Sequence, residues 1–432
     1  MRSQIVLSVL LVLTLTGCGG AVLTPESALP TPIPSPIPPI PIPTSIPTHE
    51  AQPVIVTLGL WLPEELNPYG VGAGADLLMQ QLADFSEAYP DLQVEVVVKK
   101  AHGRGGLFDF LRTARDAAPS VLPDLVVLDT ADLKNAAGSG LIQPLDHLLS
   151  PAEMADRFHF ATELGMVDEQ TLGFVIGAGM QHLAYRPALF ESPPISWTQV
   201  ISPPVPFLFP ADGIDRQVND ATMIQYLATG GKLTDPDGHP WLDEDVMLSV
   251  FSFYSDCIGT ATISPTVVLN ITDADQAWER FQAGEGGMAV VQSGRYWLEA
   301  DETVAAASVP THDGQPFSIV RRGWAIAMVT DDPARQALAV MLLDWLIAPD
   351  HNAQWTQAAG YLPGTHSALR LWDIPNADRA TLRSVMEAAV PAPRPEVEAT
   401  VGPALQEALE AVLRRRATPA EAAAAAAESV GQ

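Results

Sequence analysis

The chain has 432 residues, with 51 acidic and 23 basic side chains and a formal net charge of −28 at pH 7. This acidity argues against nucleic acid and anionic lipid surfaces as partners, because both carry negative charge. The two cysteines, Cys18 and Cys257, allow neither a disulfide framework nor a cysteine-based metal site if Cys18 is modified. The part after residue 53 is too long for one small core and predicts two domains.

Residues 1–17 are predicted to be a signal peptide. Arg2 precedes an apolar run at 5–15, which is too short to span a bilayer well. Residues 15–18, Leu-Thr-Gly-Cys, resemble a bacterial lipobox, which implies cleavage before Cys18 and acylation of its sulfur. Lipid on Cys18 would anchor the protein to the outer face of the cell membrane without a transmembrane helix. The alternative is an ordinary secretory signal in which Cys18 is incidental.

A proline-rich linker follows, so that residues 18–53 combine the lipidated cysteine with a tether. Proline at every second or third position fixes φ and removes amide donors, so neither helix nor sheet is expected there. Such a segment is stiff and polyproline-like, with about 3.1 Å per residue.

Strand and helix patterns alternate beyond the linker. Strands are predicted at 54–61, 92–98 and 125–128, and helices at 76–89 and 107–117. This alternation predicts an α/β fold with βαβ units and a mostly parallel sheet. Cys257 follows three aromatic residues in the stretch 251–254 and is predicted to be a small buried residue.

A series of short motifs then occurs in a fixed order along the chain. The motifs are Tyr89-Pro90-Asp91, Pro123-Asp124-Leu125-Val126, the stretch 140–146, Leu183-Ala184-Tyr185, Ser293-Gly294-Arg295-Tyr296, Arg322-Gly323-Trp324 and Tyr361-Leu362-Pro363. Together they resemble the family 1 extracellular solute-binding proteins, which include maltose-binding and other sugar-binding proteins. The series departs from the family at Ile176-Gly177, Tyr185-Arg186 and Arg322-Gly323, where the family has a proline, Tyr-Asn and paired glycines.

The resemblance implies a type II periplasmic-binding-protein fold with two lobes, hinge crossings and a ligand cleft between the lobes. Lobe 1 is expected to comprise 54–172 plus 316–370, and lobe 2 to comprise 173–315 plus 371–432. The implied function is that of a monomeric solute-binding lipoprotein of an ABC importer, which closes over a small polar ligand such as a sugar or oligosaccharide and delivers it to the permease subunits. No catalysis, cofactor or metal is expected.

Sugar recognition needs aromatic faces for the apolar faces of the ring and polar groups for the hydroxyls. We expect these groups at strand ends and in the adjoining loops, and the candidates are Trp61, Glu64, Asp129, Tyr296, Trp324 and Tyr361.

Several candidates have a second interpretation. Trp61 could instead pack inside its lobe, and Asp129 could cap the helix that follows it. Glu65, next to Glu64 in the same loop, could accept hydroxyl hydrogen bonds as well, and Trp297 could act in place of Tyr296. Arg295 could pair either with the ligand or with a nearby acid.

Three other functions remain open at this stage. A carbohydrate-active enzyme would need two carboxylates facing each other across a sugar ring, and no motif places such a pair. Neither Gly-x-Ser-x-Gly nor His-Glu-x-x-His is present, and the histidines are scattered. A lipoprotein that senses its ligand without transport would look the same in sequence. The ligand could also be a polyamine, a peptide or a metal chelate, because net acidity favours a cation while the aromatic residues favour a sugar.

Overall fold

The computed structural model describes residues 55–431. The predicted signal peptide, Cys18 and the linker therefore lie outside the described residues. No helix within 55–431 is both long and apolar enough to cross a bilayer.

The described part is a mixed α/β structure. Its strands are β1 (Val56–Pro63), β2 (Leu92–Lys99), β3 (Leu125–Asp129), β4 (Met166–Val167), β5 (Gln170–Thr171), β6 (Phe174–Tyr185), β7 (Phe207–Leu208), β8 (Met288–Gln292), β9 (Ala305–Ala307), β10 (Ser318–Met328) and β11 (Ala389–Pro391). Its 3-10 helices are η1 (Glu64–Leu66), η2 (Pro119–Val121), η3 (Pro187–Leu189) and η4 (Ile214–Arg216).

The α-helices are α1 (Ala73–Ala88), α2 (Leu107–Ala117), α3 (Thr130–Gly138), α4 (Pro151–Ala155), α5 (His159–Gly165), α6 (Trp197–Ile201), α7 (Asp220–Ala228), α8 (Glu244–Gly259), α9 (Pro265–Val268), α10 (Ala274–Gln282), α11 (Ser293–Glu299), α12 (Pro333–Ile347), α13 (Pro349–Ala359), α14 (His366–Leu371), α15 (Asn376–Glu387), α16 (Pro395–Leu413) and α17 (Pro419–Val430).

The elements predicted between 54 and 128 are confirmed within a few residues. Helix α2 has the predicted bounds, and α1 begins three residues before the predicted start. Helix α1 forms because Leu78, Leu82 and Phe85 recur at a helical period and are buried on one face. Strand β3 is buried along its whole length, as expected of a strand covered on both faces.

The main sheet is mixed, so the expectation of a mostly parallel sheet is wrong for the molecule as a whole. Its strands have the order β2-β1-β3-β10-β6-β8-β7. Strands β2, β1 and β3 are parallel, as the βαβ pattern predicts, but β10 is antiparallel to β3 and β6, and β6 is antiparallel to β8. The antiparallel pairs arise because β6 and β10 run in opposite directions through the middle of the sheet.

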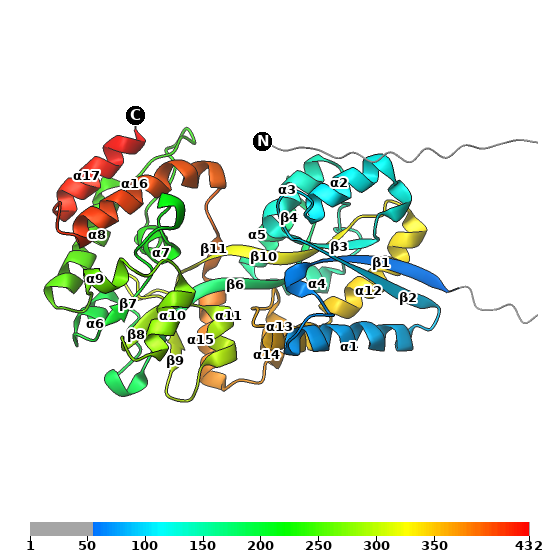
Figure 1. Ribbon diagram of the computed structural model, residues 1–432, viewed down its shortest axis with the longest axis horizontal. Coiled ribbons are helices and arrows are strands. Elements are labelled where there is room, and N and C mark those ends of the chain that lie inside the picture. Colours follow the sequence, from blue (N-terminus) through cyan, green and yellow to red (C-terminus); the bar gives the residue numbers. More distant parts are fainter. Residues whose placement is uncertain (1–54, 432) are drawn as a thin grey trace, which may run out of the picture. The chain divides into compact units, whose positions relative to one another are not determined.

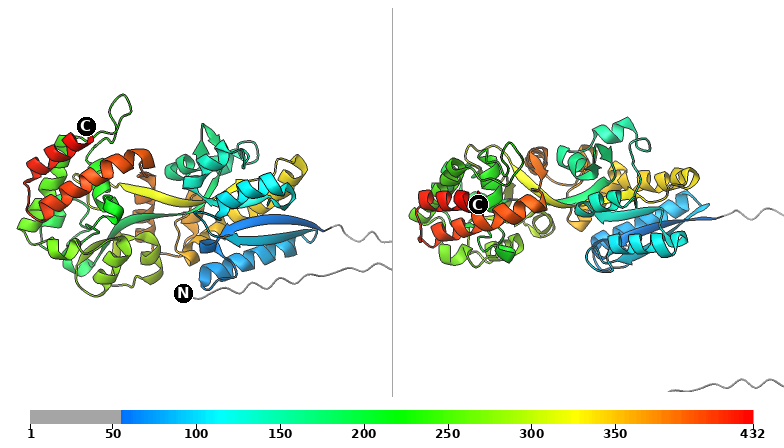
Figure 2. Two further views of the ribbon diagram at one scale, coloured as in Figure 1. Left: turned by 45° about the horizontal axis from the view of Figure 1, so that its top comes forward. Right: turned by 90° about the horizontal axis from the view of Figure 1, so that it is seen from above.

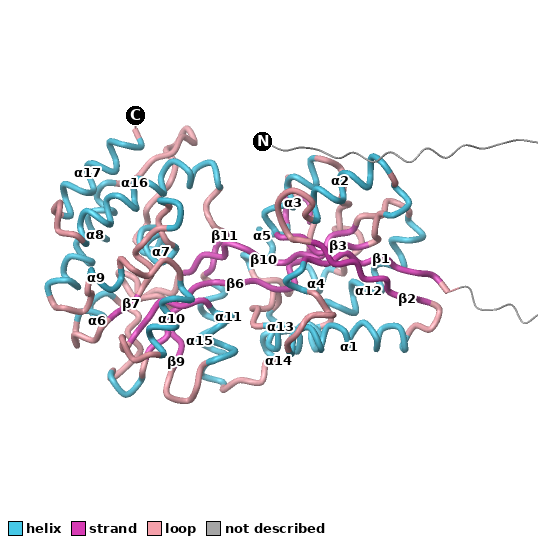
Figure 3. Tube along the Cα trace, viewed as in Figure 1, coloured by secondary structure: helices cyan, strands magenta, loops and turns pink. Residues whose placement is uncertain are grey.

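Strands β6 and β10 connect the two halves of the described part (Figure 1). The stretch 174–180 of β6 pairs with β10, whereas its residues 181–185 pair with β8. Likewise, residues 324–328 of β10 pair with β3, and residues 318–320 pair with β11. Figures 2 and 3 show both strands crossing between two groups of helices. These strands are the crossings that the sequence resemblance implies.

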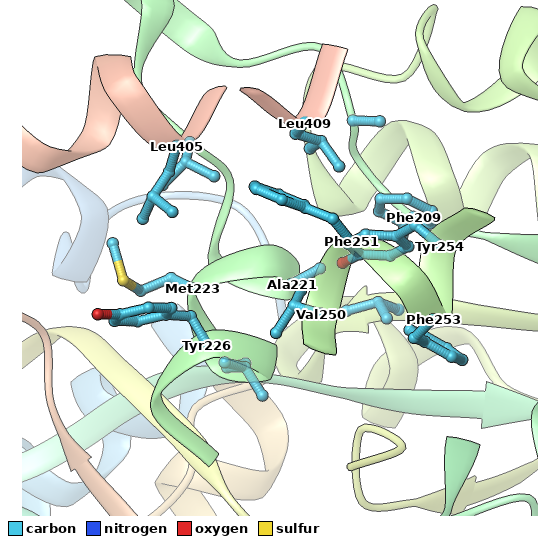
Figure 4. Packing of buried hydrophobic residues seen from close by; sticks show 14 of the residues in the cluster. Phe209, Ala221, Met223, Tyr226, Val250, Phe251, Phe253, Tyr254, Leu405 and Leu409 are labelled. Atoms are coloured by element: carbon cyan, nitrogen blue, oxygen red, sulfur yellow. The ribbon is translucent and has the colours of Figure 1, made fainter. Parts of the chain in front are cut away.

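Each half has its own hydrophobic core. In the half that contains β1–β3, Leu60, Phe85 and Ile326 belong to the core on one face of the sheet, and Val126 belongs to the core on the other. The second core gathers aromatic and aliphatic side chains of α7, α8 and α16 (Figure 4). Cys257 is fully buried in it, which confirms the prediction, and burial raises the pKa of its thiol to about 12.

The residues in each core can be compared with the predicted boundaries of the two lobes. The buried core residues of the first half lie between Leu58 and Met180 and between Val320 and Ala389, and the second half takes most of the rest. Leu382 of α15 packs in the first core although it follows the predicted boundary at 370/371. The lobe boundaries given above therefore stay a prediction, while the two halves, called lobe 1 and lobe 2 below, are defined by their cores.

Candidate ligand-binding cleft

Two adjoining hollows lie where the crossing strands meet lobe 2. The smaller, called the crossing pocket, has a volume of about 290 Å³ and is lined by β6, β10 and Tyr361. The larger, called the lobe-2 pocket, has a volume of about 570 Å³ and is lined by the start of α7, residues 272–275 and the loop at 214–219. The two share five wall residues, which are Gln181, Asp220, Gln292, Arg321 and Arg322. They therefore form one continuous cleft.

The crossing pocket has an aromatic end formed by Trp324 and Tyr361. Trp324 lies on β10 and is 9% exposed, and its indole is near enough to the Tyr361 hydroxyl to lower the pKa of that group, against the larger effect of burial. Tyr361 follows α13, and its ring stacks on Trp355 with centroids 5.6 Å apart. Burial raises the pKa of Tyr361, so this hydroxyl stays protonated and can donate to a ligand.

Glycine in β6 makes room for this aromatic end. A Cβ atom at Gly177 would lie 3.0 Å from the Cβ atom of Tyr361 and 3.2 Å from the ring of Trp355. Such distances are tighter than ordinary packing contacts, so a side chain here would displace Tyr361. Gly177 belongs to one of the places where the sequence departs from the family pattern.

Arg321 holds the lobe-2 side of the cleft together. Its guanidinium donates to Glu398 of α16 at 2.8 and 2.7 Å, and its Nε donates to Asp220 of α7 at 3.0 Å. One cation is thus shared by two carboxylates from different helices. Charge-assisted bonds of this kind are among the stronger polar contacts in proteins. Arg321 is saturated by these contacts and fixes α7 against β10.

Arg322 points toward lobe 1 instead. Its Nε lies 3.9 Å from Asp129, and its side chain is 71% exposed. Asp129 also lies 3.3 Å from Nε2 of His102, while Nδ1 of His102 lies 3.4 Å from Asp132. Burial raises the pKa of Asp132, and its Coulomb attraction to His102 opposes that rise. Lobe 1 therefore places two acids and an imidazole next to Arg322, although none of these three groups lines either pocket.

Three amide side chains in the wall of the lobe-2 pocket have an unmet hydrogen-bonding group. Oε1 of Gln181, Oε1 of Gln217 and Nδ2 of Asn219 are buried and have no hydrogen-bond partner among residues 55–431. The Oδ1 of Asn219 is already used, since it caps α7 by accepting from Thr222 at 2.9 Å. Buried amides are nearly always paired, so these groups require water or a ligand.

The structure brings two of the six predicted residues, Trp324 and Tyr361, into the cleft wall. Asp129 borders it through Arg322, but its main role is the N-cap of α3, where it accepts from Ala131 at 2.9 Å. Glu64 and Glu65 are exposed on η1 directly after β1. Of these two, Glu65 is near enough to Tyr361 for its charge to raise the pKa of that hydroxyl, after burial and the Trp324 contact.

The other two candidates lie elsewhere. Trp61 is 4% exposed and packs against Phe110 with ring centroids 5.3 Å apart, beside a separate hollow under α2. This placement agrees with its second interpretation, packing inside the lobe. Tyr296 is 4% exposed, and its ring centroid lies 4.7 Å from that of His182 and 5.8 Å from that of Trp278. Neither residue lines the crossing pocket or the lobe-2 pocket.

Arg295, which precedes Tyr296, pairs with nearby acids and not with the cleft. It donates to Glu299 at 2.9 Å and to Glu279 at 3.1 Å, so acids of α10 and α11 occupy its guanidinium. Its pairing is local to lobe 2.

The sequence reasoning missed the shared polar wall of Gln181, Asp220, Gln292, Arg321 and Arg322. One signal was available, because Arg321 and Arg322 interrupt an otherwise apolar strand. Two adjacent charges in a buried strand indicate partners or a ligand. The remaining residues carry no local signal of this kind.

Comparison with known proteins gives a consistent result. The sequence profile of the bacterial extracellular solute-binding proteins matches residues 80–380. The fold is similar to a cyclic alpha-maltosyl-1,6-maltose binding protein from Arthrobacter globiformis, at 19% identity and a TM-score of 0.65, covering 87% of this chain and 98% of that one. A family 1 extracellular solute-binding protein from Alicyclobacillus acidocaldarius matches at 14% identity and a TM-score of 0.66, covering 87% and 98%. An ABC transporter solute-binding protein from Thermotoga lettingae bound with alpha-D-tagatose matches at 20% identity and a TM-score of 0.59, covering 87% and 98%. At these identities the likeness shows that the chain shares the fold of these solute-binding proteins.

Proposed function

The chain belongs to the bacterial extracellular solute-binding proteins, and from this premise we propose that it captures a sugar or oligosaccharide in the cleft and passes it to an ABC importer. The observation that carries the proposal is that Trp324 and Tyr361 share one cleft with a dense polar wall. Aromatic rings suit the apolar faces of a sugar, and the amides and guanidinium suit its hydroxyls. The sugar-binding proteins among the structural relatives support the same ligand class.

Capture is proposed to proceed by closure of the two lobes. Strands β6 and β10 belong to both halves, so bending them changes the width of the cleft while each core stays intact. A ligand favours the closed state only through contacts that the open state lacks. Glu65, an exposed carboxylate on the lobe 1 side, is suited to make such a contact when it approaches a ligand held against lobe 2.

The protein is proposed to bind its ligand without altering it. Glycoside hydrolysis needs one carboxylic acid and one free carboxylate on opposite sides of the sugar. In the lobe-2 pocket, Asp220 and Glu398 both bind the guanidinium of Arg321, which keeps both carboxylates on one side of the pocket. The structural relatives from Arthrobacter globiformis and Thermotoga lettingae are both named as binding proteins.

A thermal-shift screen tests the ligand class. Purified protein is heated with mono- and oligosaccharides, amino acids and polyamines, each in excess. A ligand at 100 times its Kd should stabilise the fold by about 2.7 kcal/mol. We expect stabilisation by at least one sugar, which should be recovered unchanged after incubation. Stabilisation by polyamines alone, or the appearance of hydrolysis products, would contradict the proposal.

We also propose that the protein is located outside the cytoplasm and is anchored to the membrane by lipid on Cys18. The family is extracellular, and the lipobox supports the anchor. A Cys18→Ala variant should be released from the membrane fraction and should not incorporate labelled palmitate. Unchanged membrane retention of this variant would count against the anchor.

A further inference from the structure

We propose that Arg322 determines the specificity of the cleft by donating hydrogen bonds to two neighbouring oxygens of an uncharged saccharide that extends through both pockets. This inference rests on the proposed function and deepens it, since it names a residue and the size and charge of its ligand.

Arg322 is the arginine of the cleft whose guanidinium N–H groups donate no hydrogen bond within the described chain. Arg321, its neighbour, uses Nε and both terminal nitrogens on Asp220 and Glu398. The side chain of Arg322, by contrast, donates no hydrogen bond within residues 55–431. It approaches Asp129 at 3.9 Å, which is too long for a hydrogen bond, and its charge also acts on Asp132. Asp129 is itself engaged by His102 and by the amide of Ala131. The planar fork of Arg322 is therefore open to a ligand.

The backbone explains how two adjacent arginines both reach the cleft. Side chains of successive strand residues normally point to opposite faces. The register between β10 and β6 shifts between Val320 and Arg322, and such an irregularity redirects the side chains around it. Both arginines consequently line both pockets, one turned to lobe 2 and the other toward lobe 1.

The position of Arg322 sets the size of the ligand. It stands in the wall common to the crossing pocket and the lobe-2 pocket, which have volumes of about 290 and 570 Å³. The larger pocket alone is in the size range of a small-molecule site. A ligand that touches the aromatic end and also fills the lobe-2 pocket must pass Arg322, so we infer two or more sugar units.

The remaining groups set the charge of the ligand. Gln181 offers a buried acceptor and Asn219 a buried donor, both without partners in the described chain. Hydroxyl groups donate and accept, and so can satisfy both, whereas a carboxylate only accepts. An anion in the lobe-2 pocket would also meet Asp215, Asp273 and Asp275 in its wall. Arg322 is therefore matched to a pair of hydroxyls and not to an acid.

Isothermal titration of four proteins tests this inference. Glucose, maltose, maltotriose and glucuronate are titrated into the wild type and the Arg322→Ala, Arg322→Lys and Arg383→Ala variants. Arg383 is an exposed arginine on α15 paired with Glu387 at 3.6 Å, and it serves as the matched control. We expect Arg322→Ala to weaken maltotriose binding about 10- to 100-fold, with a smaller loss for glucose. Arg322→Lys should remain weak, because an ammonium lacks the planar fork, and Arg383→Ala should match the wild type.

The outcomes separate this inference from the proposed function. If the wild type binds a sugar and Arg322→Ala binds it equally well, the role of Arg322 is refuted while the function stands. If Arg322→Lys restores binding and glucuronate is the tightest ligand, the contact is with an anion and the inference is wrong. If the wild type binds none of the four and no sugar in the thermal screen, the proposed function fails and the inference fails with it.

Discussion

Arg321 donates two hydrogen bonds, of 2.8 and 2.7 Å, to the carboxylate of Glu398, which is 77 residues further along the chain. The pair joins a crossing strand to the long helix α16. The same guanidinium binds Asp220 at the start of α7, so three elements meet at one charge. The lobe-2 side of the cleft therefore keeps its shape when no ligand is bound.

Removing this guanidinium should destabilise the protein. In Arg321→Ala, Asp220 and Glu398 would be left facing each other without a cation, at a cost of about 2 kcal/mol. A loss of that size should lower Tm by roughly 4–8 °C. Scanning calorimetry measures the change. Arg383→Ala, which breaks an exposed pair, should change Tm by less than about 2 °C. Equal shifts in the two variants would refute the structural role of Arg321.

Trp324 should contribute directly to affinity. Its replacement by alanine removes the aromatic face beside Tyr361, and we expect sugar affinity to fall about tenfold or more. Titration of the variant below its melting temperature measures the loss. The matched control is Trp345→Phe on α12, which lies in lobe 1 outside the two pockets and should bind as the wild type does. Unchanged affinity in a folded Trp324→Ala variant would exclude this residue from the site.

His182 should make stability depend on acid pH. Burial lowers the pKa of His182 to about 4, from an ordinary value of about 6.5. Between these pH values the imidazole of His182 is protonated in the unfolded chain but neutral in the folded protein. The free energy of unfolding therefore falls as pH falls from about 6.5 to 4. The full contribution is about 3 kcal/mol.

Urea denaturation at pH 7.5 and pH 4.5 measures this effect. The wild type should lose more stability between the two values than His182→Gln does. Acidic residues contribute to the loss in both proteins and cancel in the comparison. His159→Gln, at an exposed position of α5, should retain the dependence of the wild type. Identical pH dependence in wild type and His182→Gln would show that the buried imidazole is not responsible.

Gly294 should be intolerant of any side chain. A Cβ atom there would lie 2.5 Å from the carbonyl oxygen of Gly360, which joins helix α11 of lobe 2 to the loop that carries Tyr361. We expect Gly294→Ala to cost about 1–3 kcal/mol and to weaken ligand binding, because Tyr361 must shift. Gly259→Ala, at an open position in α8, should be neutral or slightly stabilising. Chemical denaturation of both variants measures their stability, and titration measures their ligand affinity. A Gly294→Ala variant as stable as the wild type would contradict the close contact.

The local elements of lobe 1 were predictable because their signals are local. The apolar period of α1, the bounds of α2 and the apolar run of β3 can be read from short windows. The mixed sheet could not be read in this way. Its antiparallel pairs join Trp324 to Asp129 and Leu183 to Val290, and no window of sequence contains both partners.

The site residues likewise divide into those that a local motif indicated and those that only the fold brings together. Trp324 and Tyr361 were found because their motifs resemble those of a family, and both line the cleft. Asp220 and Gln292 were missed because only the crossing strands bring them together. Tyr296 was placed in the site from its motif, yet it turns inward on α11 and packs against His182. Its contact with ligand stays a prediction that the geometry does not favour, and a Tyr296→Phe variant with wild-type affinity would remove it.

The most direct test of the account is a crystal structure of the protein with the sugar that stabilises it most in the thermal screen. We predict that the sugar lies in the cleft lined by β6 and β10, with one ring against Trp324 and Tyr361 and oxygens within hydrogen-bonding distance of Arg322. A sugar bound instead in the hollow beside Trp61, or on the outer surface, would contradict the central claim that the crossing strands form the binding site.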